Sequence, residues 1–435
     1  MTTTSQLAAA YHRVLALRWA ATVLALPVLV PLLLARGLDL TQVALVMATF
    51  AAVTAALEVP TGGLADAFGR VRVTLAADAL ALLAHLAFIL APGLGGLLAA
   101  AALGGAARAL GSGALEAWYV DARRARDPSG GLQRPLARAG MIQSLVLAVG
   151  TLAGGALPLA APLLGIGSAG SVPALQLPFA TSMALWTVAL AVTSRLPEAR
   201  AATREARRAA RWSARPDRVA RVAAGAIARD PALVPLLALG AALGAAVMSF
   251  EAFLPAELRL RWGPEGVSLV LGTVMTGAFA ATAAGQALAA RLAAAAPCVP
   301  LARVAQGACA IAAGAVLVAF DLGTPEASRW AVVLAAAGAW LAYLGLGLAN
   351  PVLGAAFHAR VASNERATML SVQSLAAYAG GVAATLAVGM AAEAWGLAAV
   401  WFVVAATGGV AAVTAIAWRD RLGWRFAAGA LKQFD

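Results

Sequence analysis

Several carboxylates lie inside long apolar stretches of the sequence, where a charge is expensive. An ionisable residue near the centre of a lipid bilayer costs about 2.5–3.5 kcal/mol on insertion scales, so a residue kept there is a functional candidate. Carboxylates that are crowded together and shielded from water can exchange protons near neutral pH. The candidates for proton exchange are Glu58, Asp78 and Glu116. Salt bridging to nearby arginines is the alternative interpretation.

Two further charges could recognise a small molecule. Arg108 is followed at four-residue intervals by Ser112 and Glu116, which would place the three on one stripe of a helix. Arg108 could bind an anionic group or tune the proton affinity of a carboxylate, or it could form a structural ion pair. Glu251 is the only clear carboxylate within the apolar stretches of the C-terminal half. It could bind a cationic group, or it could pair locally.

The composition indicates the environment of these residues. Hydrophobic residues make up 62% of the 435 positions and charged residues 12%, against about 45–50% and about 25% in soluble domains. This excludes an ordinary soluble enzyme and a disordered protein. With 3 histidines, no Cys/His cluster and no phosphate-binding glycine loop, we expect no metal, no cofactor and no enzymatic activity.

Twelve apolar runs are each long enough to cross about 30 Å of hydrocarbon as a helix. They predict an all-α polytopic membrane protein. The predicted spans are Leu15–Ala35, Thr41–Leu64, Val73–Leu90, Leu94–Tyr119, Ala139–Ala160, Leu175–Ser194, Ala232–Leu254, Val267–Ala290, Leu301–Phe320, Trp330–Phe357, Met369–Ala391 and Leu397–Trp418.

A basic segment divides these spans into two sets of six. The predicted parts are an N-terminal half over residues 1–195, a cytoplasmic linker over 196–230, a C-terminal half over 231–418 and a cytoplasmic tail over 419–435. Arginines three or four apart from Arg200 to Arg221 predict one basic helix face. It could lie on anionic lipid headgroups, at about 1 kcal/mol per basic residue, or form a solvated linker.

The net charge of +12 follows this topology. With both termini in the cytoplasm, 27 of the 32 basic residues fall on the cytoplasmic side or at its edge, as the positive-inside rule requires. We therefore expect a multi-pass protein of the cell's inner (plasma) membrane, and no nucleic-acid partner. We expect a monomer.

A glycine-containing turn joins the second and third predicted spans, at residues 62–72. Gly62 and Gly69 permit a sharp turn, and Asp66 and Arg70 lie one helical turn apart. The turn resembles the signature loop of the major facilitator superfamily, Gly-x-Leu-Ala-Asp-basic-x-Gly-Arg-basic. Two of the usual basic positions are instead alanine and valine in this chain.

Three further segments resemble the drug and metabolite efflux members of this superfamily. They are Glu58-Val-Pro-Thr-Gly62, Ser112–Asp121 and Glu365–Ser371. The resemblance implies two six-helix halves that rock about a central site. It also implies that Asp66, Arg70 and Asp121 form an inner charge cluster that locks the outward-facing state. Gly150, Gly154 and Pro158 partly match the family's antiporter motif, although small residues also serve close packing.

The two halves show a faint repeat in sequence. Arg138–Met141 and Arg366–Met369 each precede a Gln-Ser-Leu triplet and then a glycine pair, Gly154-Gly155 or Gly380-Gly381. Related halves are typical of secondary transporters.

The same resemblance places the first, fourth, seventh and tenth helices around a cavity. It therefore adds Phe250, Trp340, Tyr343 and Asn350 as possible lining residues, unless the aromatic rings only pack. Prolines in the first span and at Asn350-Pro351 in the tenth should interrupt their helices.

The expected function is secondary transport of a small-molecule substrate. A mostly apolar cavity with few charges suits proton-coupled export of an amphipathic molecule or drug. The alternatives are import of a small metabolite on the same fold, and a membrane sensor or scaffold that does not transport.

Overall fold

The structure is a computed structural model of the chain. It describes residues 3–62, 64–127, 132–198, 216–295, 300–320, 327–362 and 365–419. These residues form helices and connecting turns, with no β-strand among them. Twelve helical segments in this part of the chain are long and apolar enough to cross a membrane, which confirms the predicted all-α fold. Helices are required because a backbone in hydrocarbon must satisfy its own hydrogen bonds.

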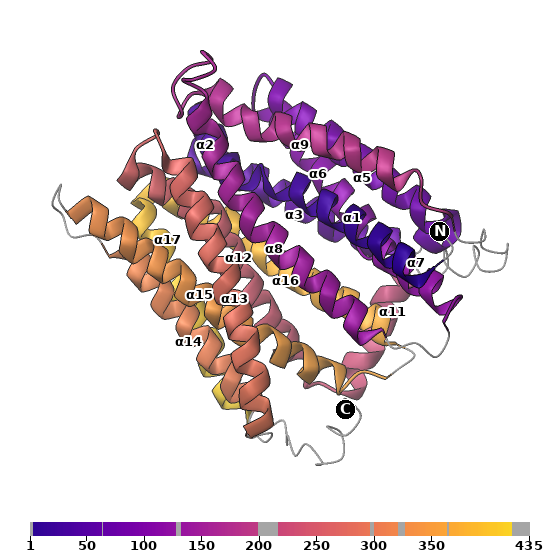
Figure 1. Ribbon diagram of the computed structural model, residues 1–435. Helices are drawn as coiled ribbons and strands as arrows, with labels where there is room; N and C mark the ends of the chain where they lie inside the picture. Colours follow the sequence, from indigo (N-terminus) through magenta and orange to yellow (C-terminus); the bar gives the residue numbers. More distant parts are fainter. Residues whose placement is uncertain are drawn as a thin grey trace. The chain divides into compact units, whose positions relative to one another are not determined.

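The chain forms two compact units. The first comprises Met1–Ala220 with Leu258–Thr276, and the second comprises Arg221–Glu257 with Gly277–Asp435. The helices before the basic segment are α1 (Thr4–Val23), a 3-10 turn η1 (Leu26–Val28), α2 (Leu29–Ala35), α3 (Leu40–Gly62), α4 (Leu64–Phe68), α5 (Arg70–Leu90), α6 (Leu94–Gly111), α7 (Ala114–Arg124), α8 (Gln133–Ala156), η2 (Leu157–Ala160) and α9 (Val172–Thr193) (Figure 1).

In the described residues after the basic segment, seven helices follow. They are α11 (Pro216–Arg229), α12 (Leu233–Trp262), α13 (Val267–Ala295), α14 (Pro300–Ala319), α15 (Ala327–His358), α16 (Arg366–Trp395) and α17 (Leu397–Arg419) (Figure 1).

Prolines act differently in three spans. The first span is interrupted as predicted, because Pro27 lies in the 3-10 turn between α1 and α2. The predicted interruption of the tenth span is wrong, since α15 continues through Pro351. α12 likewise continues through Pro255 to Trp262, beyond the predicted end of the seventh span. A proline removes one backbone hydrogen bond, and the remaining bonds of a long helix can hold it together.

Small residues form the middle of three layers of buried side chains in the first unit. There α1, α5, α6 and α9 meet through Ala21, Ala81, Ala107 and Ala189, beside the ring of Trp186. Larger side chains fill the cores on either side of this level, such as Leu32 and Phe88 in one cluster and Tyr11 and Trp118 in another. The middle level is therefore where helices approach closely and where short polar side chains can meet.

The two glycine pairs of the sequence repeat occupy comparable contacts. A Cβ added at Gly154 of α8 would collide with the backbone of Leu24, which follows α1, and a Cβ added at Gly380 of α16 would collide with that of Ala241 in α12. Each glycine therefore lets the fifth span of its half approach the first span of the same half. Close approach through small residues is a general device of membrane helix packing.

Candidate functional site

The signature turn is held by contacts with two other segments. Arg70 forms an ion pair with Asp121 of α7, at 2.6 Å between Nη1 and Oδ2, and also donates to the carbonyl of Ala117. The structure thus brings Arg70 and Asp121 together. Gly62 ends α3 and Asp66 lies in α4, but the surroundings of the Asp66 side chain lie outside the described residues.

Glu198 is a contact of this turn that the sequence analysis missed. Its carboxylate accepts hydrogen bonds from the backbone N–H groups of Val71 and Arg72, at 3.3 and 3.1 Å, and so caps the first turn of α5. Gly69 has a φ of +103°, and a Cβ there would lie 2.7 Å from the Glu198 carboxylate. Only the position of an acid just after the sixth span could have suggested this contact.

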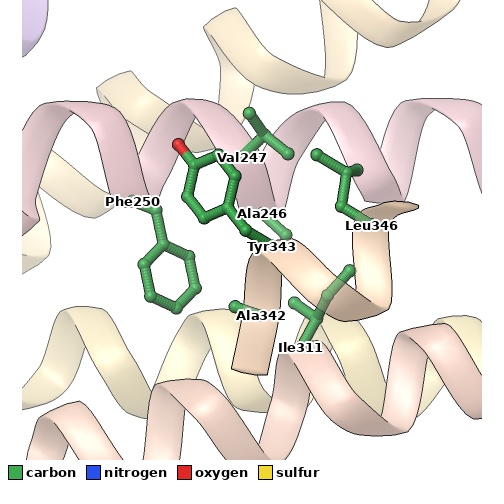
Figure 2. A pocket seen from close by; sticks show the side chains of 7 residues that line it. All are labelled: Ala246, Val247, Phe250, Ile311, Ala342, Tyr343 and Leu346. Atoms are coloured by element: carbon green, nitrogen blue, oxygen red, sulfur yellow. The ribbon is translucent and has the colours of Figure 1, made fainter. Parts of the chain in front are cut away.

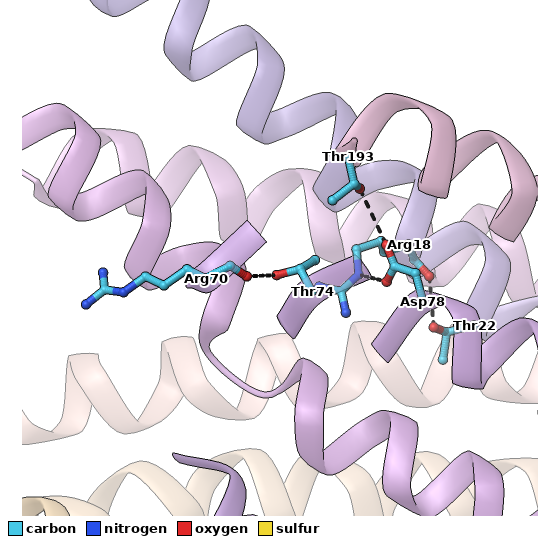
Figure 3. A network of polar contacts seen from close by, with 6 residues as sticks. All are labelled: Arg18, Thr22, Arg70, Thr74, Asp78 and Thr193. Carbon is cyan, nitrogen blue, oxygen red and sulfur yellow. Dashed lines mark hydrogen bonds and ion pairs between the residues drawn. The ribbon is translucent and has the colours of Figure 1, made fainter. Parts of the chain in front are cut away.

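Asp78 is occupied by a partner that the sequence analysis also missed. Its fully buried carboxylate pairs with Arg18 of α1, at 2.6 Å between Nε and Oδ1. The hydroxyl of Thr193 on α9 donates to the other carboxylate oxygen at 3.4 Å, as Figure 3 shows. Arg18 stands inside the predicted first span, where a basic residue is itself a signal. The pair ties three helices together.

The fourth span is broken at membrane depth. α6 ends at Gly111, Ser112 is extended, Gly113 has a φ of +72°, and α7 begins at Ala114. The predicted single stripe of Arg108, Ser112 and Glu116 is therefore wrong, because four-residue spacing aligns side chains only along one continuous helix. The Gly-Ser-Gly sequence is a recognised breaker signal that helical periodicity hides.

The break places its two charges at helix ends. Arg108 lies in the last turn of α6 and Glu116 in the first turn of α7, the positions at which each sign is stabilised by the helix dipole. Both side chains are exposed. The Arg108 guanidinium lies over the ring of Trp19, 5.5 Å from its centroid. Glu58 is partly buried near the end of α3.

A small apolar hollow lies among α12, α14 and α15 of the second unit (Figure 2). Its volume of ≈ 10 Å³ is near the minimum that holds one water molecule. It fits a substituent and not a whole ligand. The Tyr343 hydroxyl is the one side-chain polar group among its lining residues, which are Ala246, Val247, Phe250, Ile311, Ala342, Tyr343 and Leu346.

Glu251 lies beside this hollow. It follows the lining residue Val247 by four residues on α12, hence on the same helix face. Its side chain is exposed, although it stands well inside the seventh span. Within the described part of the chain, no hydrogen bond or ion pair involves the Glu251 carboxylate.

A second carboxylate of α12 corrects the prediction that Glu251 is alone. Glu257 is buried and accepts a hydrogen bond from the indole Nε1 of Trp401 on α17, at 2.9 Å. The ring of Trp401 lies 5.1 Å from that of Phe250, which in turn contacts Tyr343 edge-on at 6.5 Å. Glu257 was not predicted because the seventh predicted span ends at Leu254, before Pro255.

The other predicted lining residues lie elsewhere on α15. Trp340 is exposed and its ring covers Gly277 of α13. Asn350 has an exposed side chain. Neither lines the hollow. In the ranges that the structure describes, no group of three or more His, Cys, Asp or Glu residues could hold a metal ion.

The end of the predicted basic linker forms a helix, α11. Residues 199–215 lie outside the described residues, and Arg218 and Arg221 lie in α11. The end of α11 is tied to the turn before α16 by two ion pairs, Arg229 with Glu365 at 2.6 Å and Asp230 with Arg360 at 2.7 Å.

Comparisons with solved structures show the same fold at low identity. A nucleoside transporter, NupG, has a TM-score of 0.74 at 12% identity, with 94% of this chain and 98% of that chain covered. A peptide transporter, POT, in complex with sulfate has a TM-score of 0.73 at 14% identity, covering 97% and 99%. A POT family transporter in complex with 5-aminolevulinic acid gives 0.71 at 12%, covering 95% and 96%.

Sequence comparison gives the family. No curated protein sequence matches the chain. The family model described as Major Facilitator Superfamily matches residues 14–346, which is more than half of the chain. With twelve apolar helices and a fold shared with transporters of two kinds, this is a multi-pass membrane protein, and the chain belongs to the major facilitator superfamily of transporters.

Proposed function

We propose that the chain is a secondary active transporter that exports an amphipathic small molecule carrying a basic group, in exchange for protons. The observation that carries this proposal is the environment of Glu251. This residue is an exposed carboxylate well inside α12, beside an apolar hollow, with no ion pair among the described residues. A substrate cation would pair with the carboxylate, and an apolar substituent would enter the hollow between Phe250 and Tyr343.

A single carboxylate, that of Glu251, can couple the entry of protons to the export of the substrate cation. An unpaired charge at membrane depth costs about 2.5–3.5 kcal/mol, so a carrier that reorients is favoured to do so with Glu251 neutralised. Either a proton or a substrate cation can neutralise it, but not both together. Protons that enter down their gradient would then displace the cation outward, which gives export.

The carboxylates of the first unit support this assignment by their surroundings. Asp78 is held by Arg18 and Thr193 and is not available for exchange without breaking that pair. Glu116 sits at the start of α7, where the helix dipole favours its charge. Glu58 stays a candidate for a second proton site.

The proposal is tested by transport in sealed inside-out vesicles energised to acidify their interior. We expect accumulation of a permanent lipophilic cation, tetraphenylphosphonium, and its loss when nigericin collapses the gradient. Glu251→Gln should abolish gradient-driven accumulation. Glu265→Gln, the same change at an exposed acid after α12, is the matched control. Glu58→Gln and Glu116→Gln report whether another carboxylate carries the proton.

Three results would contradict the proposal. Gradient-independent uptake of every compound would exclude proton coupling. Normal transport by Glu251→Gln would exclude the assigned site. Gradient-driven movement into right-side-out vesicles would indicate an importer, and nucleosides and peptides are the compounds to include because transporters of these two classes share the fold.

A further inference from the structure

Two arginines of the first unit lie on helices whose side chains touch, α1 and α6. Arg18 lies in α1 and Arg108 in the last turn of α6. The Nη2 atom of Arg18 is 2.6 Å from the position that a Cβ would take at Gly111, three residues after Arg108. The guanidinium of Arg108 lies over Trp19, which directly follows Arg18. Each arginine side chain therefore lies against a residue one or three positions after the other arginine in the sequence.

Both guanidinium groups have N–H donors that meet no hydrogen-bond acceptor among the described residues. Arg18 uses Nε for Asp78, and among the described residues its two terminal amino groups donate to nothing. They are reachable, since the side chain is 15% exposed and neither group is among the enclosed polar atoms without a partner. The exposed Arg108 lies over the Trp19 ring, and within the same described residues no hydrogen bond or ion pair involves its guanidinium. Guanidinium donors lie in a planar fork that matches carboxylate, sulfonate and phosphate oxygens.

The local charge is not balanced. Asp78 compensates Arg18 at 2.6 Å, but no acidic side chain of the described residues pairs with Arg108. The end of α6 offers a partial negative charge of only about half a unit. A positive excess at this depth is costly, and the neighbouring guanidinium adds repulsion. An anion placed between the two arginines would remove both costs.

We propose that Arg18 and Arg108 form an anion-binding site for an oxyanion group of the transported molecule, with Trp19 as its aromatic wall. The groups that fit are a carboxylate, a sulfonate or a phosphate monoester. Asp78 is then the positioning residue that orients Arg18 through Nε and leaves its terminal amino groups free to bind. This inference rests on the proposed function and adds an acidic group to the substrate class.

The test compares two ligands that differ only in the anion. The first is 1-anilinonaphthalene-8-sulfonate, and the second is N-phenyl-1-naphthylamine, the same ring system without the sulfonate. Binding to the full chain in nanodiscs is measured by equilibrium dialysis, with empty nanodiscs subtracted. No proton gradient is applied. Binding is therefore separate from transport.

The variants remove one arginine at a time while keeping the protein folded. Arg108→Gln, and the neutral double variant Arg18→Gln/Asp78→Asn, should each weaken sulfonate binding at least tenfold. Binding of the neutral amine should change less than twofold, which also reports that the variants are folded. Arg108→Lys should be intermediate, because lysine keeps the charge without the fork. Arg13→Gln, at an exposed arginine of the same helix, should match the wild type.

The possible results distinguish a failure of the anion site from a failure of the proposed transport function. Equal loss of both ligands, or loss of neither, would overturn the anion site. Displacement of the sulfonate by millimolar chloride or inorganic phosphate, with no transport of the sulfonate in the vesicle assay, would overturn the assignment of the anion to the transported molecule. Intact sulfonate selectivity without gradient-driven flux of any compound would refute the proposed function and leave the anion site standing.

Discussion

Replacing Asp78 by asparagine leaves the guanidinium of Arg18 without its counter-charge inside the first unit. The carboxylate is 0% exposed and the Arg18 side chain 15% exposed, with 2.6 Å between the bonded atoms. Removing one partner of such a buried pair costs about 3–5 kcal/mol, which corresponds to roughly a 100- to 5,000-fold larger unfolding constant. Asparagine can still accept from Nε but supplies no charge, so we expect Asp78→Asn to fall near the lower bound.

Denaturant unfolding in mixed micelles, followed by far-UV circular dichroism, measures this loss. Asp127→Asn is the control, because its ion pair with Arg123 spans 4.0 Å and Asp127 is 40% exposed, a class of pair worth about 0–1 kcal/mol. The double variant Arg18→Gln/Asp78→Asn removes both charges and should regain most of the stability. If Asp78→Asn is no less stable than the control, the buried pair does not hold the unit as argued.

Two further substitutions test contacts that only the structure reveals. Gly69→Ala meets both a φ of +103° and the carboxylate that caps α5, so it should destabilise by about 1–3 kcal/mol. It should do so more than Gly37→Ala, where φ is +84° in open space; equal effects would mean that the cap does not matter. Trp401→Phe removes the indole donor of Glu257 at 2.9 Å and should cost about 1.5–3 kcal/mol, against little for Trp395→Phe at a 77% exposed ring. A null result at Trp401 would show that the buried carboxylate has another sufficient partner.

The fold could be predicted from the sequence because the lipid environment restricts the possibilities. A run of about 20 apolar residues has one stable form in hydrocarbon, a helix, and the described structure has a span for each predicted run. Helix ends were less predictable. Proline signalled the turn at Pro27 but not the continuation of α12 through Pro255, because neighbouring helices decide whether the loss of one hydrogen bond is tolerated.

The candidate site was harder to predict because charge pairing is a tertiary property. Composition identified Asp78, Arg108 and Glu251 as costly charges. It could not show that Asp78 pairs with Arg18, because the two residues lie in different spans. Arg18 also lies only three residues after the start of the predicted first span, so it was grouped with the basic residues at the cytoplasmic edge. Helical spacing predicted a stripe from Arg108 to Glu116, and a local breaker overrode it.

The central claim is that a proton and a substrate cation share Glu251, and equilibrium binding tests it most directly. The affinity of the purified chain for tetraphenylphosphonium is measured across a range of pH, for wild type and Glu251→Gln. If the two ligands compete, wild-type binding weakens as the pH falls, and the variant binds weakly at every pH. A variant that binds with wild-type affinity and the same pH dependence would contradict the assignment of Glu251 as the exchange site.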